Sequence, residues 1–273
     1  MNKDILILGN GFIGKRLQDG FGCRLSGKFI RTLSEAEDLI KKFKPKVIIN
    51  CIGITGKRNV DDCELEKDAT LLANSFVPMI LAEAALRNNV KLVHISSGCI
   101  YHYDYAKDSP VCEDKTPDFF DLFYSRSKIY SDAALNILAS RYPILIVRIR
   151  IPVDDRPGPK NTLDKIIRYR RVIDVENSVT YIPDMIKALR HLMKINARGI
   201  YNVVNKGGLR YARLLEAYKK YFPDFKFTVV PFNRLKLVRT NLLMSTRKLE
   251  KSGFKVRNIN SVLEECVKGY IRY

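Results

Sequence analysis

The sequence has few of the residues that build metal sites or disulfide frameworks. Its six cysteines are scattered without C-x-x-C spacing, and its three histidines (His94, His102 and His191) are isolated from one another. This pattern predicts reduced thiols in a cytosol-like compartment and no metal site. No apolar run reaches the roughly 18–20 residues that a membrane-spanning helix needs, and the chain begins on an apolar strand instead of a signal peptide. We therefore expect a cytoplasmic protein that does not bind a membrane.

Acidic residues are scarce relative to basic ones. The chain has 29 Asp and Glu against 48 Lys and Arg, a formal net charge of +19. The basic residues are spread along the chain, and no RNA- or DNA-binding motif accompanies them. Three explanations of this charge stay open: nucleic-acid binding, a solvated surface, and the binding of phosphate-bearing ligands. The even spread of the basic residues favours the last two.

Strand and helix patterns alternate through the first half of the chain, which is typical of a parallel sheet. Strands are predicted at Ile5–Leu8, Cys23–Leu25, Val47–Cys51, Leu92–Ser96 and Ile144–Ile149, and Gly199–Asn205 is predicted to return to the sheet. Helices are predicted at Phe12–Asp19, Glu35–Phe43, Leu65–Asn88 and Phe123–Ser140, two of them with possible caps at Ser34 and Asp121.

The predicted fold is α/β, a Rossmann-type doubly wound parallel sheet with a smaller C-terminal substrate-binding lobe. The segment Asp154–Asn161 breaks the alternation with two prolines and a glycine, and should lead into that lobe. We assign residues 1–150 and 174–205 to the cofactor domain, and residues 151–173 and 206–273 to the lobe.

A glycine-rich turn follows the first predicted strand, in the string DILILGNGFIGKRL. Its G-x-G-x-x-G pattern lies between an apolar strand and a helix start, which is the context of a dinucleotide fingerprint. The first glycine permits the tight turn, the second lets the backbone approach a pyrophosphate, and the third lets the helix pack against the strand. Free N–H groups of the helix start would then bind the phosphates. The predicted cofactor turn comprises Gly9, Asn10, Gly11, Phe12, Ile13 and Gly14.

The string FYSRSK places Tyr124 and Lys128 four residues apart, on one face of a predicted helix. A lysine ammonium beside a phenol favours the phenolate, so we expect a lowered tyrosine pKa and proton transfer to a carbonyl oxygen near neutral pH. Ser97 follows the strand at Lys91–Ser96, at the edge where doubly wound sheets bind ligands. Each feature alone also fits a solvated helix face or a plain turn. Together they predict a Ser-Tyr-Lys site.

The strand, the glycine turn, the serine edge and Y-x-x-x-K together resemble the extended short-chain dehydrogenase/reductase family. Longer strings resemble one group within it, the plant and viral nucleotide-rhamnose synthases, which are bifunctional UDP-4-keto-6-deoxyglucose 3,5-epimerase/4-reductases. These strings are NCIGITGKRNVDDCE, SSGCIYHYD, DKTPDFFDLFYSRSK, RIRIP, NSVT, RGIYNVVN and RTNLL. The chain resembles dTDP-4-dehydrorhamnose reductase more distantly.

Cys99 separates these two groups, because the epimerase-reductases carry S/T-G-C where reductase-only proteins lack the cysteine. The resemblance implies that Cys99 and Lys165 form the acid/base pair for epimerisation at C3 and C5, whose protons are acidic beside a C4 ketone. The same resemblance implies a role in cofactor binding for Gly53 and Lys128. It implies substrate contacts for Ser97, Cys99, Tyr124, Asn161, Arg239 and Asn241.

The implied activity is conversion of a UDP- or dTDP-linked 4-keto-6-deoxyglucose to the L-rhamnose form, by a homodimer. NADPH is expected over NADH, because no acidic residue clearly ends the second strand, while Arg24, Lys28 and Arg31 lie nearby. Of these, Arg31 is the predicted cofactor contact. Three alternatives stay open: a reductase without epimerase activity, a GDP-fucose-synthase-type enzyme, and a non-catalytic regulator that binds a cofactor or nucleic acid.

Overall fold

The computed structural model describes residues 2–235 and 238–273, and it divides into two compact units. The first comprises Met1–Ile100, Pro117–Arg148 and Leu192–Tyr201; the second comprises Tyr101–Thr116, Ile149–His191 and Asn202–Tyr273. The expected cofactor domain, residues 1–150 and 174–205, also includes residues 101–116, 149–150, 174–191 and 202–205, which lie in the second unit. Within the second unit β8 (Thr180–Tyr181) pairs with β6 (Pro152–Val153), Asn177 bridges to Leu209, and Val111 bridges to Met244.

The first unit is built on a six-stranded sheet in the order β2-β1-β3-β4-β5-β9. Its strands are β1 (Asn2–Leu8), β2 (Cys23–Ser26), β3 (Val47–Asn50), β4 (Lys91–Ser97), β5 (Ile144–Ile149) and β9 (Gly199–Asn202). β1 pairs in parallel with β2 and with β3, and β3 pairs in parallel with β4. The order reverses between β1 and β3. In a doubly wound sheet, ligands bind beyond the carboxyl ends of the strands at such a switch point.

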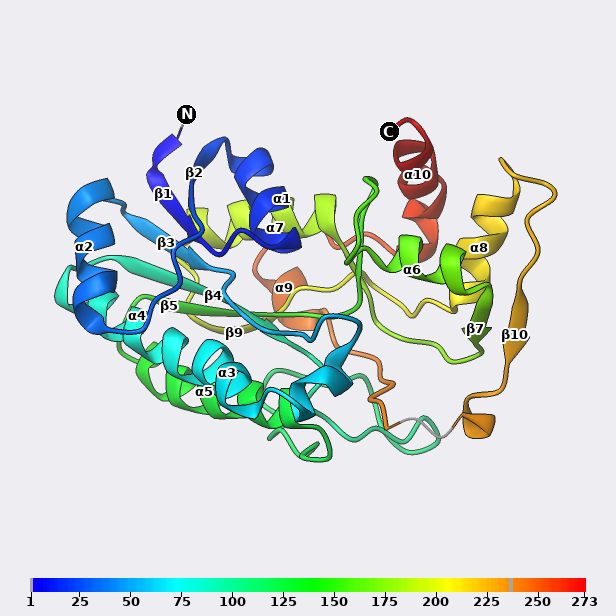
Figure 1. Ribbon diagram of the computed structural model, residues 1–273, viewed down its shortest axis with the longest axis horizontal. Helices are drawn as coiled ribbons and strands as arrows, with labels where there is room; N and C mark the ends of the chain where they lie inside the picture. Colours follow the sequence, from blue (N-terminus) through cyan, green and yellow to red (C-terminus); the bar gives the residue numbers. More distant parts are fainter. Residues whose placement is uncertain (1, 236–237) are drawn as a thin grey trace. The chain divides into compact units, whose positions relative to one another are not determined.

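Helices cover both faces of this sheet (Figure 1). α2 (Leu33–Phe43), α4 (Val77–Arg87) and α5 (Phe123–Ala139) share one apolar core with alternate strand residues such as Leu6, Leu8 and Ile48. α1 (Phe12–Phe21) lies on the opposite face (Figure 1). The predicted strands and helices are confirmed to within a few residues.

Neither predicted cap is the observed one. Thr32 caps α2 in a capping box with Glu35, and Ser34 lies inside the helix. The residue before α5 is Leu122, which cannot cap with its side chain, and Asp121 lies one position further out. The backbone N–H of Phe123 instead donates to Glu64 Oε1 at 2.6 Å. A carboxylate distant in sequence thus satisfies the start of the helix that carries Tyr124 and Lys128.

The longest helical stretch corrects the expectation that no apolar run is long enough to span a membrane. α3 (Lys67–Leu71), the π-helical turn η2 (Leu72–Phe76) and α4 form one helix, Lys67–Arg87, whose length and composition would suffice. Of its apolar window 56% is buried inside the structure. Ala73, Val77 and Leu81 of this helix belong to the core of the first unit.

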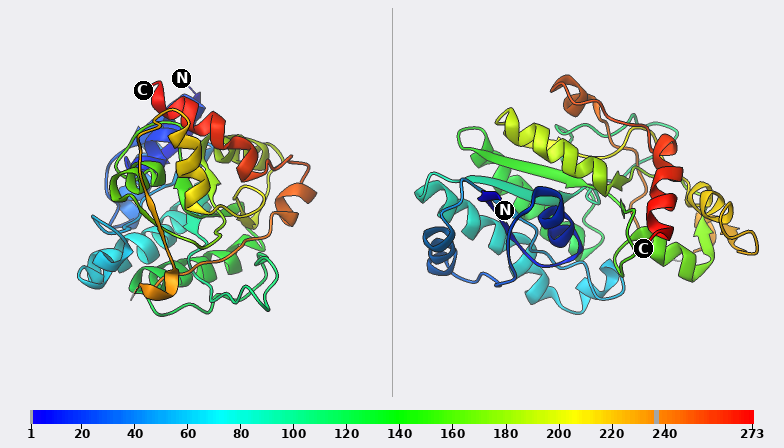
Figure 2. Two further views of the ribbon diagram at one scale, coloured as in Figure 1. Left: turned by 90° about the vertical axis from the view of Figure 1, so that its right-hand side faces the viewer. Right: turned by 90° about the horizontal axis from the view of Figure 1, so that it is seen from above.

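The second unit has its own apolar core and two small sheets. β6 pairs with β8, and β7 (Arg171–Ile173) pairs in parallel with β10 (Thr228–Val230). Its helices are α6 (Thr162–Tyr169), most of α7 (Ile182–Lys194), α8 (Tyr211–Lys219), α9 (Arg247–Lys251) and α10 (Ile259–Ile271). α8 and α10 pack side by side (Figure 2). Leu214, Leu215, Val262 and Val267 from these two helices are completely buried between them.

Candidate functional site

The glycine turn at the end of β1 has the geometry that its pattern predicts. Gly9 has φ +103°, a conformation that residues with a Cβ rarely adopt. A Cβ on Gly14 would lie 1.9 Å from the carbonyl oxygen of Gly9, so the third glycine is required for the helix to pack against the turn. A Cβ on Gly11 would meet nothing within 4 Å, so this side of the turn is open.

The start of α1 is free to bind an anion. Gly11 is its N-cap residue and offers no side-chain cap, and the first turn contains no acidic residue. Unsatisfied N–H groups and the helix dipole therefore face the open side of the turn. The residues present fit the pyrophosphate of a dinucleotide, as the fingerprint predicts.

The loop after β3 brings the predicted Gly53 against Lys128. A Cβ at Gly53 would lie 3.3 Å from Lys128 Nζ and 3.1 Å from Asn74 Oδ1. Asn74 fixes this loop, because its amide accepts from the N–H of Ile54 (2.9 Å) and donates to the carbonyl of the same residue (3.0 Å). Asn74 lies in the π-helical turn η2, a distortion that is frequent at functional sites.

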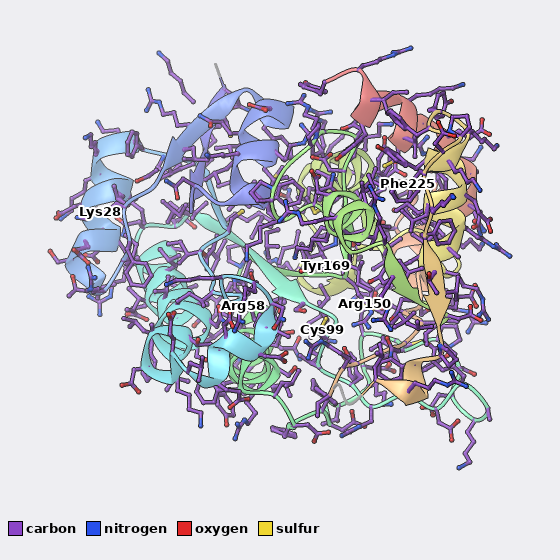
Figure 3. All side chains as sticks on the ribbon, turned by 45° about the vertical axis from the view of Figure 1, so that its right-hand side comes forward. Lys28, Arg58, Cys99, Arg150, Tyr169 and Phe225 are labelled. Atoms are coloured by element: carbon purple, nitrogen blue, oxygen red, sulfur yellow. The ribbon has the colours of Figure 1, made fainter. Side chains whose placement is uncertain are left out.

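The carboxyl end of β4 carries Ser97 and Cys99 on one short turn (Figure 3 labels Cys99). The N–H of Cys99 donates to Ser97 Oγ at 3.1 Å, and Ser125 Oγ on α5 donates to the Cys99 carbonyl at 2.6 Å. The Cys99 thiol is half-buried, and Ser97 is buried. Tyr124, also on α5, is buried, and its pKa responds to both Ser97 and Cys99. The structure therefore brings Ser97, Cys99 and Tyr124 together.

The predicted lowering of the tyrosine pKa is wrong. Burial raises the pKa of Tyr124 well above its ordinary value, and nearby Cys99 adds to the rise, while the hydrogen bond with Ser97 opposes it. Lys128 is 4% exposed, and burial lowers its own pKa to about 8. The cost of burying either charged form exceeds the benefit of placing lysine and phenol on one helix face. Tyr124 is therefore a neutral phenol, ready to donate a proton.

The three basic residues near β2 have different surroundings. Arg24 donates to the carbonyl of Phe43 at 3.3 Å and stacks over the ring of the same residue. Lys28 lies 3.7 Å from Glu35. Arg31, the predicted cofactor contact, is exposed and stacks over Phe29. β2 ends at Ser26, so no carboxylate occupies the position that would hold a free ribose 2′-hydroxyl.

Asn161 and Lys165 lie in the second unit, at the start of α6. Asn161 is completely buried, and its amide accepts from the N–H groups of Asp154 and Leu163 and donates to the carbonyls of Asp154 and Arg156. These four bonds use its whole hydrogen-bonding capacity. Asn161 therefore holds the 154–161 turn, and its amide has no hydrogen bond left for the expected substrate contact. Lys165 is half-buried, and burial followed by the charge of Lys160 lowers its pKa.

Of the two remaining predicted residues, Asn241 lies in a polar cluster of the second unit that is centred on Arg150 (labelled in Figure 3). The buried Arg150 guanidinium donates to Asn177 Oδ1 at 2.7 Å and to Thr240 Oγ1 at 3.0 Å. Asn177 Nδ2 donates to Asn241 Oδ1 at 3.0 Å. The strings RIRIP, NSVT and RTNLL, which lie far apart in sequence, therefore meet at one arginine. Arg239 is partly exposed, and its guanidinium donates to the Val238 carbonyl at 2.6 Å.

Sequence reasoning missed several polar residues that support the site. Asn74 contacts the cofactor loop, Asp132 lies behind Lys128, and His94 is buried beside Asn50. Arg150 lies in the string RIRIP, whose pattern does not indicate a role for it. A signal was available for Asp132, because it stands four residues after Lys128 on the same helix face. Asn74 and His94 had no such signal, since their partners come from other elements.

The sheet order, the glycine turn and the serine, tyrosine and lysine constellation define a Rossmann-type protein of the extended short-chain dehydrogenase/reductase class. More narrowly, residues 9–211 match the family described as RmlD substrate binding domain, and the chain belongs to this family.

Among its relatives is a trifunctional UDP-glucose 4,6-dehydratase/UDP-4-keto-6-deoxy-D-glucose 3,5-epimerase/UDP-4-keto-L-rhamnose-reductase of Arabidopsis thaliana. It is 33% identical over 238 residues, which cover 84% of this chain and 35% of that protein. The chain thus spans about a third of the length of this relative. A bifunctional dTDP-4-dehydrorhamnose 3,5-epimerase/reductase of the same plant is 32% identical over 68% of this chain and 63% of its own length.

Solved structures match the whole fold. The UDP-rhamnose synthase of Acanthamoeba polyphaga mimivirus has a TM-score of 0.88 at 25% identity, covering 97% of this chain and 98% of that chain. A dTDP-4-dehydrorhamnose reductase of Bacillus anthracis in complex with NADP has a TM-score of 0.82 at 22% identity, covering 100% of this chain and 99% of that chain. The second likeness concerns the fold alone.

Proposed function

We propose that the protein is an NADPH-dependent reductase of a nucleotide-linked 4-keto-6-deoxy sugar that also epimerises this sugar at C3 and C5. The observation that carries the reductase part is the buried set of Ser97, Tyr124 and Lys128, next to an open glycine turn at the switch point of the sheet. The names of the plant and mimivirus relatives support the substrate class.

The residues of the first unit divide the work of reduction. Gly9 and Gly14 shape the turn and Gly11 leaves it open for the cofactor, which when bound supplies a hydride. Ser97 binds the C4 carbonyl oxygen of the sugar. Tyr124 donates its proton to that oxygen as negative charge develops, which suits a phenol that burial keeps neutral.

Lys128 gives the proton transfer a cationic neighbour at physiological pH. Its pKa of about 8 keeps most of it protonated near neutrality. Its ammonium lies beside Gly53, on the loop where the nicotinamide ribose would bind. Reduction should therefore decline as the pH rises through about 8.

Epimerisation rests on Cys99 and Lys165. Inversion at C3 or C5 requires one group to remove a proton and another to return it from the opposite face. Cys99 is half-buried on the turn that carries Ser97, and Lys165 is a half-buried lysine with a lowered pKa. In the second unit, Arg239 and Asn241 are proposed to bind the nucleotide diphosphate, because an arginine fork suits phosphate oxygens.

Incubation with UDP-4-keto-6-deoxyglucose and NADPH tests both steps, with NADPH oxidation followed by absorbance and the sugar product identified by NMR. Tyr124→Phe should lower the reduction rate by about 10²–10⁴-fold. Tyr130→Phe, a matched control on an exposed tyrosine of the same helix, should not. Full turnover by Tyr124→Phe would exclude the assigned proton donor.

Deuterium exchange at C3 and C5 tests the epimerase step separately. Cys99→Ser and Lys165→Ala should each block exchange, and a sugar that is already epimerised should still be reduced. Cys112→Ser, a control at another half-buried cysteine, should exchange normally. If Cys99→Ser exchanges at the wild-type rate, the protein is a reductase that depends on a separate epimerase.

A further inference from the structure

Behind the Ser97–Tyr124–Lys128 site lies a buried acid that the proposed chemistry does not use. Asp132 is 1% exposed. Its Oδ1 accepts a 2.5 Å hydrogen bond from Ser96 Oγ, and its Oδ2 accepts a 2.9 Å hydrogen bond from Arg148 Nε. Arg148 is as deeply buried, at 2%. A buried ion pair is weak evidence of stabilisation, so its place in the molecule requires another explanation.

Asp132 connects three elements that build the site, namely α5, β4 and β5. Asp132 lies on α5, one helical turn beyond Lys128, so the two side chains share a face. Ser96 is the β4 residue immediately before Ser97, and Arg148 is on the neighbouring strand β5. The two hydrogen bonds of one carboxylate therefore fix the helix that carries Tyr124 and Lys128 against the strand that carries Ser97 (Figure 1 shows α5 along the sheet).

Asp132 also provides a negative charge that favours the ammonium form of Lys128. Four titratable groups from different elements act on Lys128 or are acted on by it: Asp132 on α5, Cys51 after β3, Cys63 on η1 (Val60–Glu64) and His94 on β4. On the same helix Tyr124 lies four residues before Lys128, and on β5 Arg148 pairs with Asp132. Of the groups that favour its charged form, Asp132 contributes most, ahead of Cys51 and Cys63. Burial raises the pKa of both cysteines, which favours the neutral thiols over the charged thiolates.

We propose that Asp132 is a positioning residue for the proposed reaction: its carboxylate holds α5 in register with β4 through Ser96 and Arg148, and places a negative charge one helical turn from Lys128. Arg148 and Ser96 hold the carboxylate in place, on the helix face that it shares with Lys128. Without this charge, burial of Lys128 would favour the neutral amine. The proposal rests on the proposed function for its meaning, but its central claim concerns the charge of Lys128 and is measurable without turnover.

The test compares loss of the charge with loss of a hydrogen bond. Asp132→Asn keeps the shape and removes the charge, and Ser96→Ala removes one hydrogen bond and keeps the charge. The protonation midpoint of Lys128 is measured in the protein alone by NMR of ¹³C-labelled lysine, with its resonance assigned by its absence from Lys128→Met. The midpoint should fall by about one pH unit in Asp132→Asn. It should stay near the wild-type value in Ser96→Ala.

The alkaline limb of the pH–rate profile for sugar reduction should move with the midpoint. An acid that served only for packing would lower the rate at every pH and leave the limb in place. An unchanged midpoint in Asp132→Asn, or an equal fall in Ser96→Ala, would overturn the proposal. If the wild type reduces no sugar but the midpoint still falls in Asp132→Asn, the proposed function fails and the link between Asp132 and Lys128 stands.

The single variant leaves Arg148 buried without its carboxylate, which is strongly destabilising in general. If Asp132→Asn does not fold, the midpoint of Lys128 is compared between Arg148→Met and the double variant Arg148→Met/Asp132→Asn, which differ only in the charge of Asp132. A lower Lys128 midpoint in the double variant supports the proposal, and an unchanged midpoint overturns it.

Discussion

Replacing Lys128 by methionine should abolish reduction and yet make the protein more stable. The side chain is 4% exposed, and burial lowers its pKa from 10.5 to about 8. The lysine is mostly charged at pH 7, so the folded protein bears the cost of holding an ammonium away from water. A methionine of similar length fills the same space without that charge. Asp132 keeps Arg148 as its partner in the variant.

The magnitude follows from the change in pKa. A fall of about 2.5 at 1.36 kcal/mol per pKa unit corresponds to about 3 kcal/mol. At about 2–4 °C per kcal/mol for a chain of this size, the melting temperature at pH 7 should rise by about 6–12 °C. Such a gain in stability upon loss of activity is typical of groups that function requires and folding disfavours.

The gain should depend on pH in a definite direction. Below pH 8 the folded and the unfolded chain both hold the lysine proton, and the full cost is present. Between pH 8 and 10.5 the folded protein has released this proton and the unfolded chain has not, so the unfolding free energy of the wild type rises with pH. The advantage of Lys128→Met should therefore shrink over this window.

Thermal unfolding followed by circular dichroism at pH 7, 8.5 and 10 measures this difference. Lys41→Met, at an exposed lysine of α2, is the control and should change stability by less than about 0.5 kcal/mol at any of these values. The reasoning is refuted if Lys128→Met melts at or below the wild-type temperature at pH 7. It is also refuted if its advantage is the same at pH 7 and pH 10.

Three further outcomes are expected. Gly14→Ala should lower the melting temperature by several degrees, because its Cβ would meet the Gly9 carbonyl at 1.9 Å. Gly11→Ala should melt normally and, in a fluorescence titration, bind NADPH more weakly. Equal melting temperatures of the two variants would contradict this geometry. His94 is buried, and its pKa lies well below its ordinary value of 6.5, so the wild-type unfolding free energy should fall as pH drops below 6.5. Urea titrations should show that His94→Gln loses this part of the acid sensitivity, and an unchanged slope would exclude His94 as its source. Anisotropy with random duplex DNA at 0.15 M salt should show weak binding despite the net charge of +19; tight binding that persists with saturating NADPH and nucleotide-sugar would favour a nucleic-acid partner.

The features that the sequence determined by itself are local ones. The glycine turn requires only neighbours within six positions, and the same-face placement of Tyr124 and Lys128 requires only helical spacing. The alternation of strands and helices predicted the sheet, because each element carries its own periodicity. These patterns hold wherever the segments finally pack, which is why the predicted elements agree with the structure to within a few residues.

Tertiary structure decided the electrostatics and the long-range partners. The pKa of Tyr124 is raised and not lowered because burial outweighs the lysine on its helix face, and burial is a property of the whole unit. Glu64 reaches the start of α5, and Asp132 joins Ser96 to Arg148. In the second unit, Arg150 gathers segments up to 90 residues away in the chain. Such contacts arise when the chain folds back on itself, and no local periodicity encodes them.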